Sequence, residues 1–474
     1  MSSPRLLIAN EWIDSAATLP VVNPFTGEEI ARVPLGDDAT IHAAISAAEA
    51  AFPLARSTAP HARAALLLAV ARGIEARRAA FVETMVAEGG KPVVFAEAEV
   101  ERAVITFTVA AEEARRQHGE LLDLDAFPTG HGHFGLARRF PLGVISAITP
   151  FNFPLNLVAH KVAPCLATGN TMVLKPATKT PLTALLLAEV LVEAGMPAGQ
   201  VNFITCTNDD ALRLVADARV KKVTFTGSPA VGWRLKDLCG KKRITLELGG
   251  NAGCIVHGDA DLAAAAPAVA MGGFAQAGQS CISVQRVLVH ETIYDDFRAR
   301  LVAHIAGKIK TGDPRDRDTV VGPMITADAL AQIRARIDAA VAAGAKIVHG
   351  GKTSGPCLEA TVLEDVPPQH DLCAKEAFAP IVTLHRYRDF EEALAFVNDS
   401  EFGLQAGVFT RDLRLAMRAF DALEVGGVMV NQVPTFRVEN MPYGGVKSSG
   451  FGREGVRYAM EEMTELKSFV VRIV

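Results

Sequence analysis

The sequence lacks several features that would assign it to other protein classes. It contains no run of 18 uncharged apolar residues, so we expect no membrane-spanning helix. The apolar stretch near the start is too short for the core of an export signal. Acidic and basic residues nearly balance, 53 against 48, and the basic residues are spread along the chain. This distribution does not indicate a nucleic-acid-binding surface.

Cysteine is sparse, and its spacing is not that of a metal site. Seven cysteines occur in 474 residues, and none forms a C-x-x-C pair. The odd count and this spacing argue against a disulfide framework and against structural zinc. We therefore expect a reducing, cytoplasmic location, no metal, and at least one free thiol that is available for chemistry.

The middle of the chain alternates between strand-like and helix-like segments. Helical patterns at 182–195 and 209–218 separate short β-branched runs, which lie at 144–149, 171–175, 201–204, 222–226 and 243–247. A long Ala-rich helical stretch precedes them at 41–117. This alternation predicts an α/β fold with a parallel sheet that binds ligands at the carboxyl ends of its strands.

A second α/β pattern follows Gly250. Strand-like runs at 253–257 and 285–290 alternate with helical patterns at 259–278 and 292–309. Two α/β halves would therefore meet near 247–250, and we expect the active site in the cleft between them.

The spacing G-x-G-x-x-G occurs at 130–135 and at 450–455. As a dinucleotide-binding turn it needs a preceding strand and a following helix. The first copy precedes a strand-like segment, and the second lies in a stretch that resembles a loop. We do not expect either copy to bind pyrophosphate.

A series of motifs covers nearly the whole chain and resembles the aldehyde dehydrogenase superfamily. In order they are TPFNFP (149–154), VLKPATKTP (173–181), FTGSPAVG (225–232), LELGGNAG (246–253), FAQAGQSCISVQR (274–286), KEAFAP (375–380) and MPYGGVKSSGFGRE (441–454). The C-terminal region looks most like the branch that oxidises lactaldehyde, glyceraldehyde 3-phosphate without phosphorylation, and phosphonoacetaldehyde. The resemblance implies NAD(P)-dependent oxidation of an aldehyde to its carboxylic acid.

By this resemblance Cys281 is the nucleophile and Glu247 is the general base. The thiolate would add to the aldehyde to give a thiohemiacetal, and loss of hydride to the nicotinamide would leave a thioester. Glu247 would activate the water that hydrolyses it. The alternatives are a buried structural thiol for Cys281 and a loop-capping carboxylate for Glu247.

Three more residues resemble parts of this catalytic machinery. Asn152 would hold the developing oxyanion together with the Cys281 backbone N–H, although an Asx-turn before Pro154 is the alternative. Lys161 and Glu454 would carry the proton away from the base. Each of these two could instead be a solvent-facing residue.

The cofactor implied is NAD or NADP. Lys175 would bind the adenosine ribose, Glu376 would bind the nicotinamide ribose, and Phe378 would pack beside the ring. Gly227 and Ser228 would open a helix whose N-terminus favours phosphate. The remaining cofactor-binding candidates are Thr149, Pro150, Phe151, Ala177 and Thr178. Thr178 stands where many NAD-specific relatives have a glutamate, so NADP is admissible as well.

The substrate candidates are Arg102, His160 and Arg437. Arginine forks match the oxygens of phosphate, sulfonate and carboxylate, which favours a small aldehyde with an anionic tail, or a hydroxylated one. Against this, Ser280 replaces the arginine that part of this branch uses for phosphate, and Phe153 offers no hydroxyl. The alternative is that both arginines form structural ion pairs and that His160 packs at the entrance.

The resemblance also implies the domain organisation. Residues 1–120 and 144–246 would form a Rossmann-like NAD(P)-binding domain, 247–440 a catalytic α/β domain, and 121–143 with 455–474 a small β extension for oligomerisation. An exposed β edge of this kind pairs readily with a second subunit, which predicts a homodimer or homotetramer.

Other functions remain open. A CoA-acylating semialdehyde dehydrogenase is the nearest, but members of that branch tend to lack a base such as Glu247. A thiol esterase would leave the nucleotide motifs unused. A non-catalytic binding or structural protein derived from this fold would be expected to lose Cys281 or Glu247, and this chain keeps both.

Overall fold

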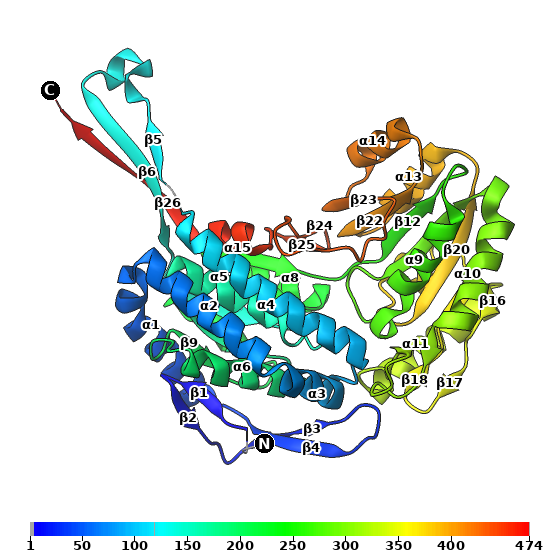
Figure 1. Ribbon diagram of the computed structural model, residues 1–474, viewed down its shortest axis with the longest axis horizontal. Coiled ribbons are helices and arrows are strands. Elements are labelled where there is room, and N and C mark those ends of the chain that lie inside the picture. Colours follow the sequence, from blue (N-terminus) through cyan, green and yellow to red (C-terminus); the bar gives the residue numbers. More distant parts are fainter. Residues whose placement is uncertain (1–3, 118, 474) are drawn as a thin grey trace.

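The computed structural model describes residues 4–117 and 119–473, which form two α/β lobes and a projecting arm (Figure 1). The helices of the first lobe are α1 (Asp38–Ser57), α2 (Pro60–Ala76), α3 (Arg78–Gly89), α4 (Val93–Arg115), α5 (Asn156–Thr168), α6 (Leu182–Glu193), α7 (Ala211–Ala216), α8 (Pro229–Leu238) and α15 (Val456–Glu462). Those of the second lobe are α9 (Leu262–Phe274), α10 (Tyr294–Lys308), α11 (Ala327–Ala342), α12 (Asp371–Ala374), α13 (Phe390–Asn398) and α14 (Leu413–Ala422).

The first lobe is built on an eight-stranded sheet. Its order is β2 (Glu11–Ile13), β1 (Leu6–Ile8), β9 (Val201–Phe203), β8 (Thr171–Lys175), β7 (Val144–Ile148), β10 (Val220–Thr226), β11 (Arg243–Glu247) and β25 (Gly450–Phe451). The strands from β9 to β11 run parallel. The strands predicted between 144 and 247 are confirmed, and β10 begins two residues earlier than expected. The predicted α/β class is therefore confirmed.

Both faces of this sheet are covered. Along β7, Ile145 and Ala147 belong to the core beneath α2 to α6, whereas Val144 and Ile148 belong to the core beneath α1, α7 and α8. This alternation follows from the two-residue period of a strand. Burial on both faces explains why these strands are apolar throughout.

The strand order places a ligand crevice at the centre of the sheet. The chain passes from β7 to β8 on one side, and β10 lies on the other side of β7. Parallel sheets bind ligands where the strand order reverses, at the carboxyl ends. The residues that leave β7 and β10 there are Thr149 and Gly227.

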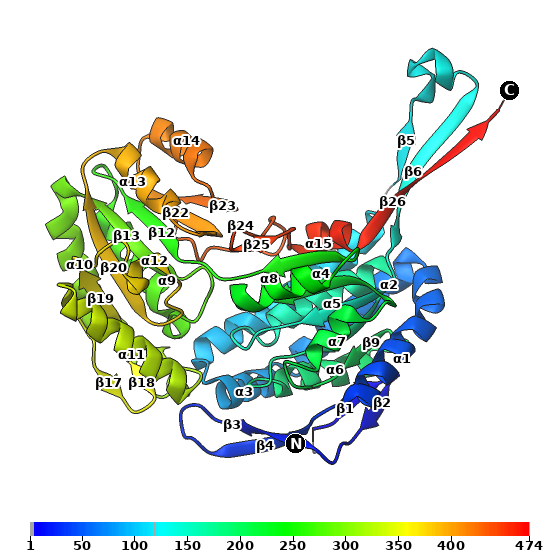
Figure 2. The same ribbon diagram turned by 180° about the vertical axis from the view of Figure 1, so that it is seen from behind.

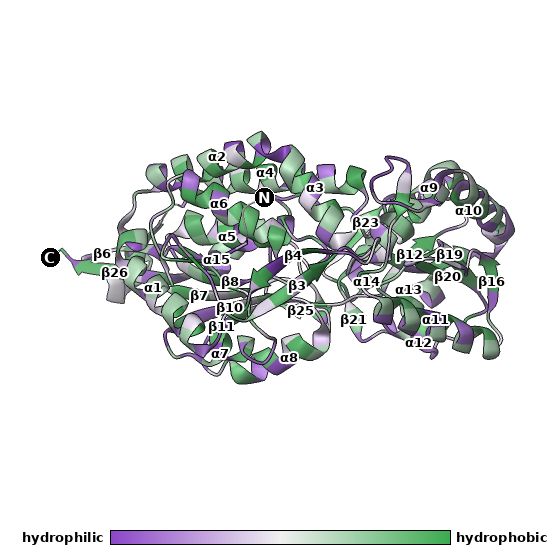
Figure 3. Cartoon of the chain, turned by 90° about the horizontal axis from the view of Figure 1, so that it is seen from below, coloured by the Kyte–Doolittle hydropathy of each residue, from purple (hydrophilic) through white to green (hydrophobic). Residues whose placement is uncertain are grey.

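The second lobe contains a seven-stranded sheet. Its order is β16 (Lys346–His349), β19 (Thr361–Glu364), β20 (Ile381–Tyr387), β13 (Val284–His290), β12 (Ala252–Val256), β22 (Gln405–Phe409) and β23 (Gly427–Val430). Helices α9 to α11 cover one face, and α13 and α14 cover the other. Its inner strands are mostly hydrophobic in Figure 3. The helix expected at 259–278 ends earlier, at Phe274, where a 3₁₀ turn, η3 (Ala275–Gly278), begins.

The arm is a three-stranded antiparallel sheet that projects from the first lobe (Figures 1 and 2). Its order is β26 (Thr464–Arg472), β6 (His133–Pro141) and β5 (Glu120–Leu122). Just before it, α15 packs against α4 and α5. The glycine motif at 450–455 differs from expectation because it includes the short strand β25, which pairs with β11.

Four strand pairs complete the fold. They are β3 (Thr18–Val22) with β4 (Glu29–Pro34), β14 (Lys310–Thr311) with β15 (Thr319–Val321), β17 (Thr353–Ser354) with β18 (Cys357–Leu358), and β21 (Phe402–Gly403) with β24 (Val446–Lys447). Within the described residues, no helix combines the length and apolarity needed to cross a membrane.

Candidate active site

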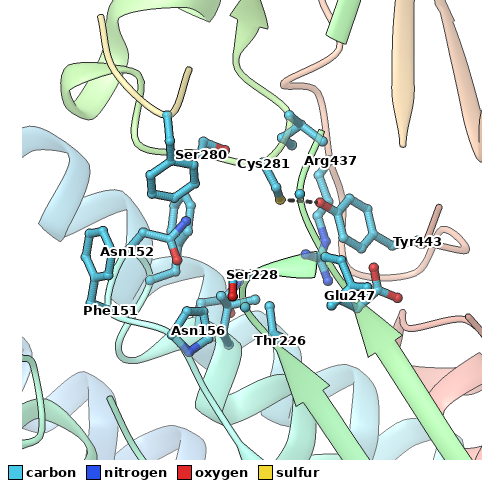
Figure 4. Close-up of a pocket in the computed structure, with 18 of the residues that line it drawn as sticks. Phe151, Asn152, Asn156, Thr226, Ser228, Glu247, Ser280, Cys281, Arg437 and Tyr443 are labelled. Carbon is cyan, nitrogen blue, oxygen red and sulfur yellow. Dashed lines mark hydrogen bonds between the residues drawn. The ribbon is translucent and has the colours of Figure 1, made fainter. Parts of the chain in front are cut away.

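A cavity of about 250 Å³ lies where the carboxyl ends of β7, β10 and β11 face the loop after α9 (Figure 4). Residues of both lobes line it, which confirms the cleft expected between the two halves. The predicted site residues in its wall are Cys281, Glu247, Asn152, Pro150, Phe151, Gly227, Ser228, Glu376, Phe378, Arg102 and Arg437. Those that lie outside the wall are Thr149, His160, Lys161, Lys175, Ala177, Thr178 and Glu454.

A strained turn presents Cys281 to the cavity. Within η3, Gln276 and Ala277 adopt left-handed φ values of 53° and 56°, a conformation that costs non-glycine residues about 1–2 kcal/mol each. Two hydrogen bonds tie the turn to the opposite wall. The Gln276 side chain donates to the Asn152 backbone oxygen, and the Asn152 side chain donates to the Gln279 backbone oxygen at 3.0 Å. The thiol is therefore held at a fixed place opposite the first lobe.

The thiol of Cys281 lies in a largely apolar environment. It packs against Ile282, Leu404 and Tyr443, and its Sγ lies 3.1 Å from the Tyr443 Oη (Figure 4). Burial raises the pKa of Cys281 to about 12, and the hydrogen bond with Tyr443 acts against this increase. All seven cysteines are free thiols. Cys281 is partly exposed, whereas the other six are buried.

Glu247 ends β11 on the first-lobe side of the cavity. Its side chain is buried, and neither carboxyl oxygen accepts a hydrogen bond from any residue that the structure describes. Burial, and then the negative charge of Glu454, raises the pKa of Glu247 well above its usual value. A buried carboxyl group with a raised pKa is suited to act as a general base. The loop-capping alternative is wrong, because neither oxygen accepts a backbone N–H from the part of the chain that the structure describes.

Lys161 and Glu454 form a buried ion pair behind Glu247. Lys161 Nζ lies 2.8 Å from Glu454 Oε1 and 3.0 Å from Thr224 Oγ1. Burial acts to raise the pKa of Glu454, but the charges of Lys161 and His160 outweigh it and lower that pKa. The solvent-facing alternative for both residues is wrong, since their side chains are 0% and 2% exposed.

Asn152 uses only part of its hydrogen-bonding capacity. One N–H of its amide group donates to the loop that carries Cys281, as described above, and an amide NH₂ has a second N–H. Its Oδ1 has no partner within the described part of the chain. The geometry thus leaves one donor available on the cavity side of the turn.

Groups suited to a nicotinamide nucleotide line the neighbouring wall. Glu376 accepts a hydrogen bond from the Gly250 backbone N–H at 2.9 Å, and burial raises its pKa to about 7. Phe378 packs edge-on against Phe151, with 5.8 Å between ring centroids. Ser228 is the N-cap of α8, so the helix expected after it is confirmed.

The other cofactor candidates gather at the ends of β7 and β8. Lys175 is buried and contacts the Asn208 Oδ1 at a long 3.4 Å, and burial lowers its pKa. The hydroxyl of Thr149 is buried without a partner among the residues described. Ala177 and Thr178 follow in the turn after β8 and are half-buried. The ammonium of Lys175 and the hydroxyl of Thr149 are therefore available to hydrogen-bond a ribose.

The three substrate candidates lie in different environments around Glu439. The guanidinium of Arg437 lies over the ring of Tyr443 at 3.8 Å, and its Nε and Nη2 find no acceptor in the described regions. Arg102 lines the cavity and donates through Nε to Glu439 at 2.7 Å. The imidazole of His160 bonds the other oxygen of Glu439. His160 is therefore a buried residue outside the lining of the cavity and does not lie at the entrance. Its imidazole is hydrogen-bonded to Glu439 instead.

Sequence reasoning missed several residues of the site. The sequence motifs assign no role to Tyr443 or Glu439, although Tyr443 lies inside the motif at 441–454. Asn156 also lines the cavity and accepts a hydrogen bond from Thr106 at 3.1 Å. A polar aromatic residue within a glycine-rich motif was the available signal for Tyr443. No comparable local signal exists for Glu439.

The described residues contain no cluster of three or more His, Cys, Asp or Glu side chains that could hold a metal ion.

Comparison with known proteins agrees with this geometry. The model of the aldehyde dehydrogenase family matches residues 12–469. The chain is 40% identical to the 3-sulfolactaldehyde dehydrogenase of Priestia aryabhattai, over 99% of this chain and 98% of that protein. Aldehyde dehydrogenase 21 from Physcomitrella patens, solved with the reaction product succinate, superposes with a TM-score of 0.97 at 43% identity, covering 100% of this chain and 98% of the other. The NADP complex of the NADP-dependent glyceraldehyde-3-phosphate dehydrogenase from Bacillus halodurans C-125 has a TM-score of 0.97 at 33% identity and covers 100% of both chains.

Proposed function

The chain belongs to the aldehyde dehydrogenase family, and from this we propose that it oxidises a small anionic or hydroxylated aldehyde to its acid with Cys281 as nucleophile and Glu247 as base. The enzyme is an NAD(P)-dependent aldehyde dehydrogenase, and solved proteins similar to it are named as NAD-dependent or NADP-dependent dehydrogenases. The observation that carries the proposal is one shared cavity, lined by a thiol from one lobe and by a carboxyl group from the other that has no hydrogen-bond partner among the described residues.

The cofactor is NAD or NADP. The residues at the crevice where the strand order of the first sheet reverses fit such a nucleotide. Glu376 would hold the nicotinamide ribose, Ser228 and the α8 N-terminus would face phosphate, and Lys175 would hold the adenosine ribose. Two observations support this: the hydroxyl of Thr149 has no partner in the described ranges, and the ammonium of Lys175 makes only a long contact with Asn208. When bound, the nicotinamide supplies the two-electron acceptor of the reaction.

The first half of the reaction uses Cys281 and Asn152. The Cys281 thiolate adds to the aldehyde carbon, and the carbonyl oxygen becomes an oxyanion. The free N–H of the Asn152 amide and the Cys281 backbone N–H would stabilise this charge, a contribution worth about 3–4 kcal/mol per donor. Oxidation of the thiohemiacetal then leaves an acyl thioester on Sγ.

The second half uses Glu247. Its carboxylate takes a proton from water, the oxygen of that water bonds to the thioester carbon, and the C–S bond breaks to release the carboxylic acid and the thiolate. The ion pair of Lys161 and Glu454 borders Glu247, and we propose that it receives the proton afterwards. Because the charge of Glu454 raises the pKa of Glu247, the proton stays on Glu247 until it is passed on.

The substrate tail would bind the arginines. Arg437 is 7% exposed in its side chain, and two of its guanidinium nitrogens have no acceptor in the described chain. Its nearest ion-pair oxygen, on Glu454, is 4.0 Å away. Arg102 contributes a second guanidinium to the same cavity. A carboxylate, sulfonate or phosphate on a short aldehyde would satisfy these donors.

A substrate panel tests this function directly. Short aldehydes with neutral, hydroxyl, carboxylate, sulfonate and phosphate tails are each supplied with NAD or NADP, with and without coenzyme A. We expect the highest kcat/KM for an anionic tail, a free acid as product, and no dependence on coenzyme A. Equal kcat/KM for all tails would contradict the anionic assignment, and acyl-CoA as the main product would contradict hydrolysis by Glu247.

We also propose a homo-oligomer assembled through the arm, in a cytoplasmic location. Apolar side chains from Leu466 to Ile473, along and just after β26, are exposed to 38–70%; they are Leu466, Phe469, Val470, Val471 and Ile473. An apolar open strand edge is a ready partner for a second copy. The seven free thiols support a reducing compartment. Phe469→Glu should lower the molar mass measured by light scattering, and an unchanged mass would contradict assembly through this edge.

A further inference from the structure

We propose that Tyr443 is a further catalytic residue, whose hydroxyl donates a hydrogen bond to the Cys281 thiolate and whose ring carries the Arg437 guanidinium. This inference rests on the proposed role of Cys281. It assigns a function to a side chain that contacts both Cys281 and Arg437.

The contact with Cys281 is direct. The Oη of Tyr443 lies 3.1 Å from Sγ, across 162 residues of sequence, and both side chains face the same cavity (Figure 4). Ile282 and Leu404 also pack against the thiol, and neither side chain offers a hydrogen-bonding group. Among the described side chains, Tyr443 alone is recorded as hydrogen-bonded to Sγ. Its hydroxyl is therefore placed to stabilise negative charge on the sulfur.

The phenol is suited to the donor role. Burial raises the pKa of Tyr443 well above its usual value, so the hydroxyl keeps its proton when the thiol has lost its own. Burial also raises the pKa of Cys281, and the bond from Tyr443 is the largest influence in the opposite direction. Of the charged groups that face the thiol, Glu376 and Glu247 disfavour the thiolate, and Arg437 favours it.

The ring links the thiol to the proposed tail site. The Arg437 guanidinium carbon lies 3.8 Å from the ring centroid of Tyr443, within the range of a cation–π contact. A cation over the ring withdraws electron density and makes the hydroxyl a stronger donor. Tyr443 thus makes two contacts. The face of its ring packs against the Arg437 guanidinium, and its hydroxyl hydrogen-bonds to the Cys281 sulfur.

The substitution Tyr443→Phe separates these two roles, since it removes the hydroxyl and keeps the ring. The Cys281 alkylation rate with iodoacetamide is measured between pH 7 and 9.5 without aldehyde or cofactor, with the modified peptide identified by mass spectrometry. In this reaction the sulfur bonds to carbon, iodide leaves, and the thiol proton goes to solvent. A hydrogen bond to a charged group is worth about one to two pKa units.

We expect Tyr443→Phe to be alkylated about three- to tenfold more slowly at each pH. The loss of thiolate is only partly offset by the greater nucleophilicity of a more basic sulfur. Tyr387→Phe is the matched control, because it removes a buried hydroxyl bonded to His257 at 2.8 Å in β20, outside the wall of the cavity. It should leave the rate unchanged. Equal rates for Tyr443→Phe and the unmodified enzyme would overturn the proposal.

A second variant tests the ring. Tyr443→Leu should slow alkylation as Tyr443→Phe does, and should in addition raise KM for an anionic aldehyde about tenfold, because Arg437 loses its platform. Tyr443→Phe should keep KM within twofold. An equal rise in KM for both variants would overturn the division of roles. Failure of the proposed function would appear separately, as absent NAD(P)H formation in the unmodified enzyme.

Discussion

Two regions of the first lobe bury carboxyl groups, and they differ in how fully the oxygens are bonded. Beneath the helices, Glu88 accepts hydrogen bonds from the backbone of Leu182 and Thr183, at the start of α6. Glu99 accepts from the backbone of Leu155 and Asn156 at the start of α5 and is paired with Lys91. At the cavity, Glu247 has no such partner among the residues described.

The difference teaches how the fold uses burial. Where every oxygen is bonded, the carboxylate caps a helix and contributes to stability. Where none is bonded, burial costs stability and leaves the group available for proton transfer. The same contrast separates Lys91, which is paired with Glu99, from Arg437, whose Nε and Nη2 lack acceptors in the described chain.

The largest expected effect is on activity and comes from Glu247→Gln. Loss of the base should slow acid formation about a thousandfold. Because the carboxyl group makes no hydrogen bond to the described residues, the melting temperature should stay within a few degrees of the original. Steady-state kinetics and a thermal melt measure both quantities. If Glu247→Gln melts at a much lower temperature and keeps its activity, Glu247 is a structural carboxyl group and not the base.

The complementary change is Glu99→Gln, which should act on stability. It leaves the Lys91 ammonium buried without its counter-charge, and breaking such a pair costs about 3–5 kcal/mol. We expect a clear drop in the unfolding midpoint in guanidinium chloride. Adding Lys91→Met should recover part of it, since no unpaired charge then remains. If the single variant is as stable as the original, Glu99 does not support α5 in the way described.

Arg437→Met should have a smaller, substrate-dependent effect. Loss of a charge-assisted contact of about 1.5–3 kcal/mol raises KM for an anionic aldehyde roughly ten- to hundredfold. A neutral aldehyde of the same length serves as the control and should be affected little. KM values that rise equally for both aldehydes would show that Arg437 shapes the cavity instead of binding the tail.

The smallest expected effect is a shift in pH dependence in Glu454→Gln. Glu247 acts as a base only when ionised, and the charge of Glu454 raises its pKa. Removing that charge lowers the pKa of Glu247, so the acid limb of thioester hydrolysis should move to lower pH, by up to about one unit. Single-turnover acid release across pH measures the shift. Movement of the limb to higher pH would contradict the coupling.

The sequence predicted those parts of the molecule that local patterns determine. The strands from β7 to β11 carry their own apolar pattern, and Cys281 and Glu247 lie in motifs that are complete within a few residues. The break of the helix at Phe274 was not visible, because the strained turn after it depends on bonds to Asn152 in the other lobe.

Contacts over long sequence separations could not be predicted. Tyr443 meets Cys281 across 162 residues, and Glu439 meets Arg102 across 337. His160 is hydrogen-bonded to the same Glu439. It is therefore buried, although the sequence predicts a residue at the entrance. Packing of the two lobes sets these distances, and no local period or motif encodes them.

Trapping the acyl group on the enzyme is the most direct measurement of the proposed chemistry. Glu247→Gln is mixed with an accepted aldehyde and the preferred nucleotide, quenched in acid and analysed by mass spectrometry after digestion. We predict an acyl group on the peptide that contains Cys281, formed together with one equivalent of reduced nucleotide. Reduced nucleotide without any adduct on Cys281, or an adduct on another cysteine, would contradict the mechanism.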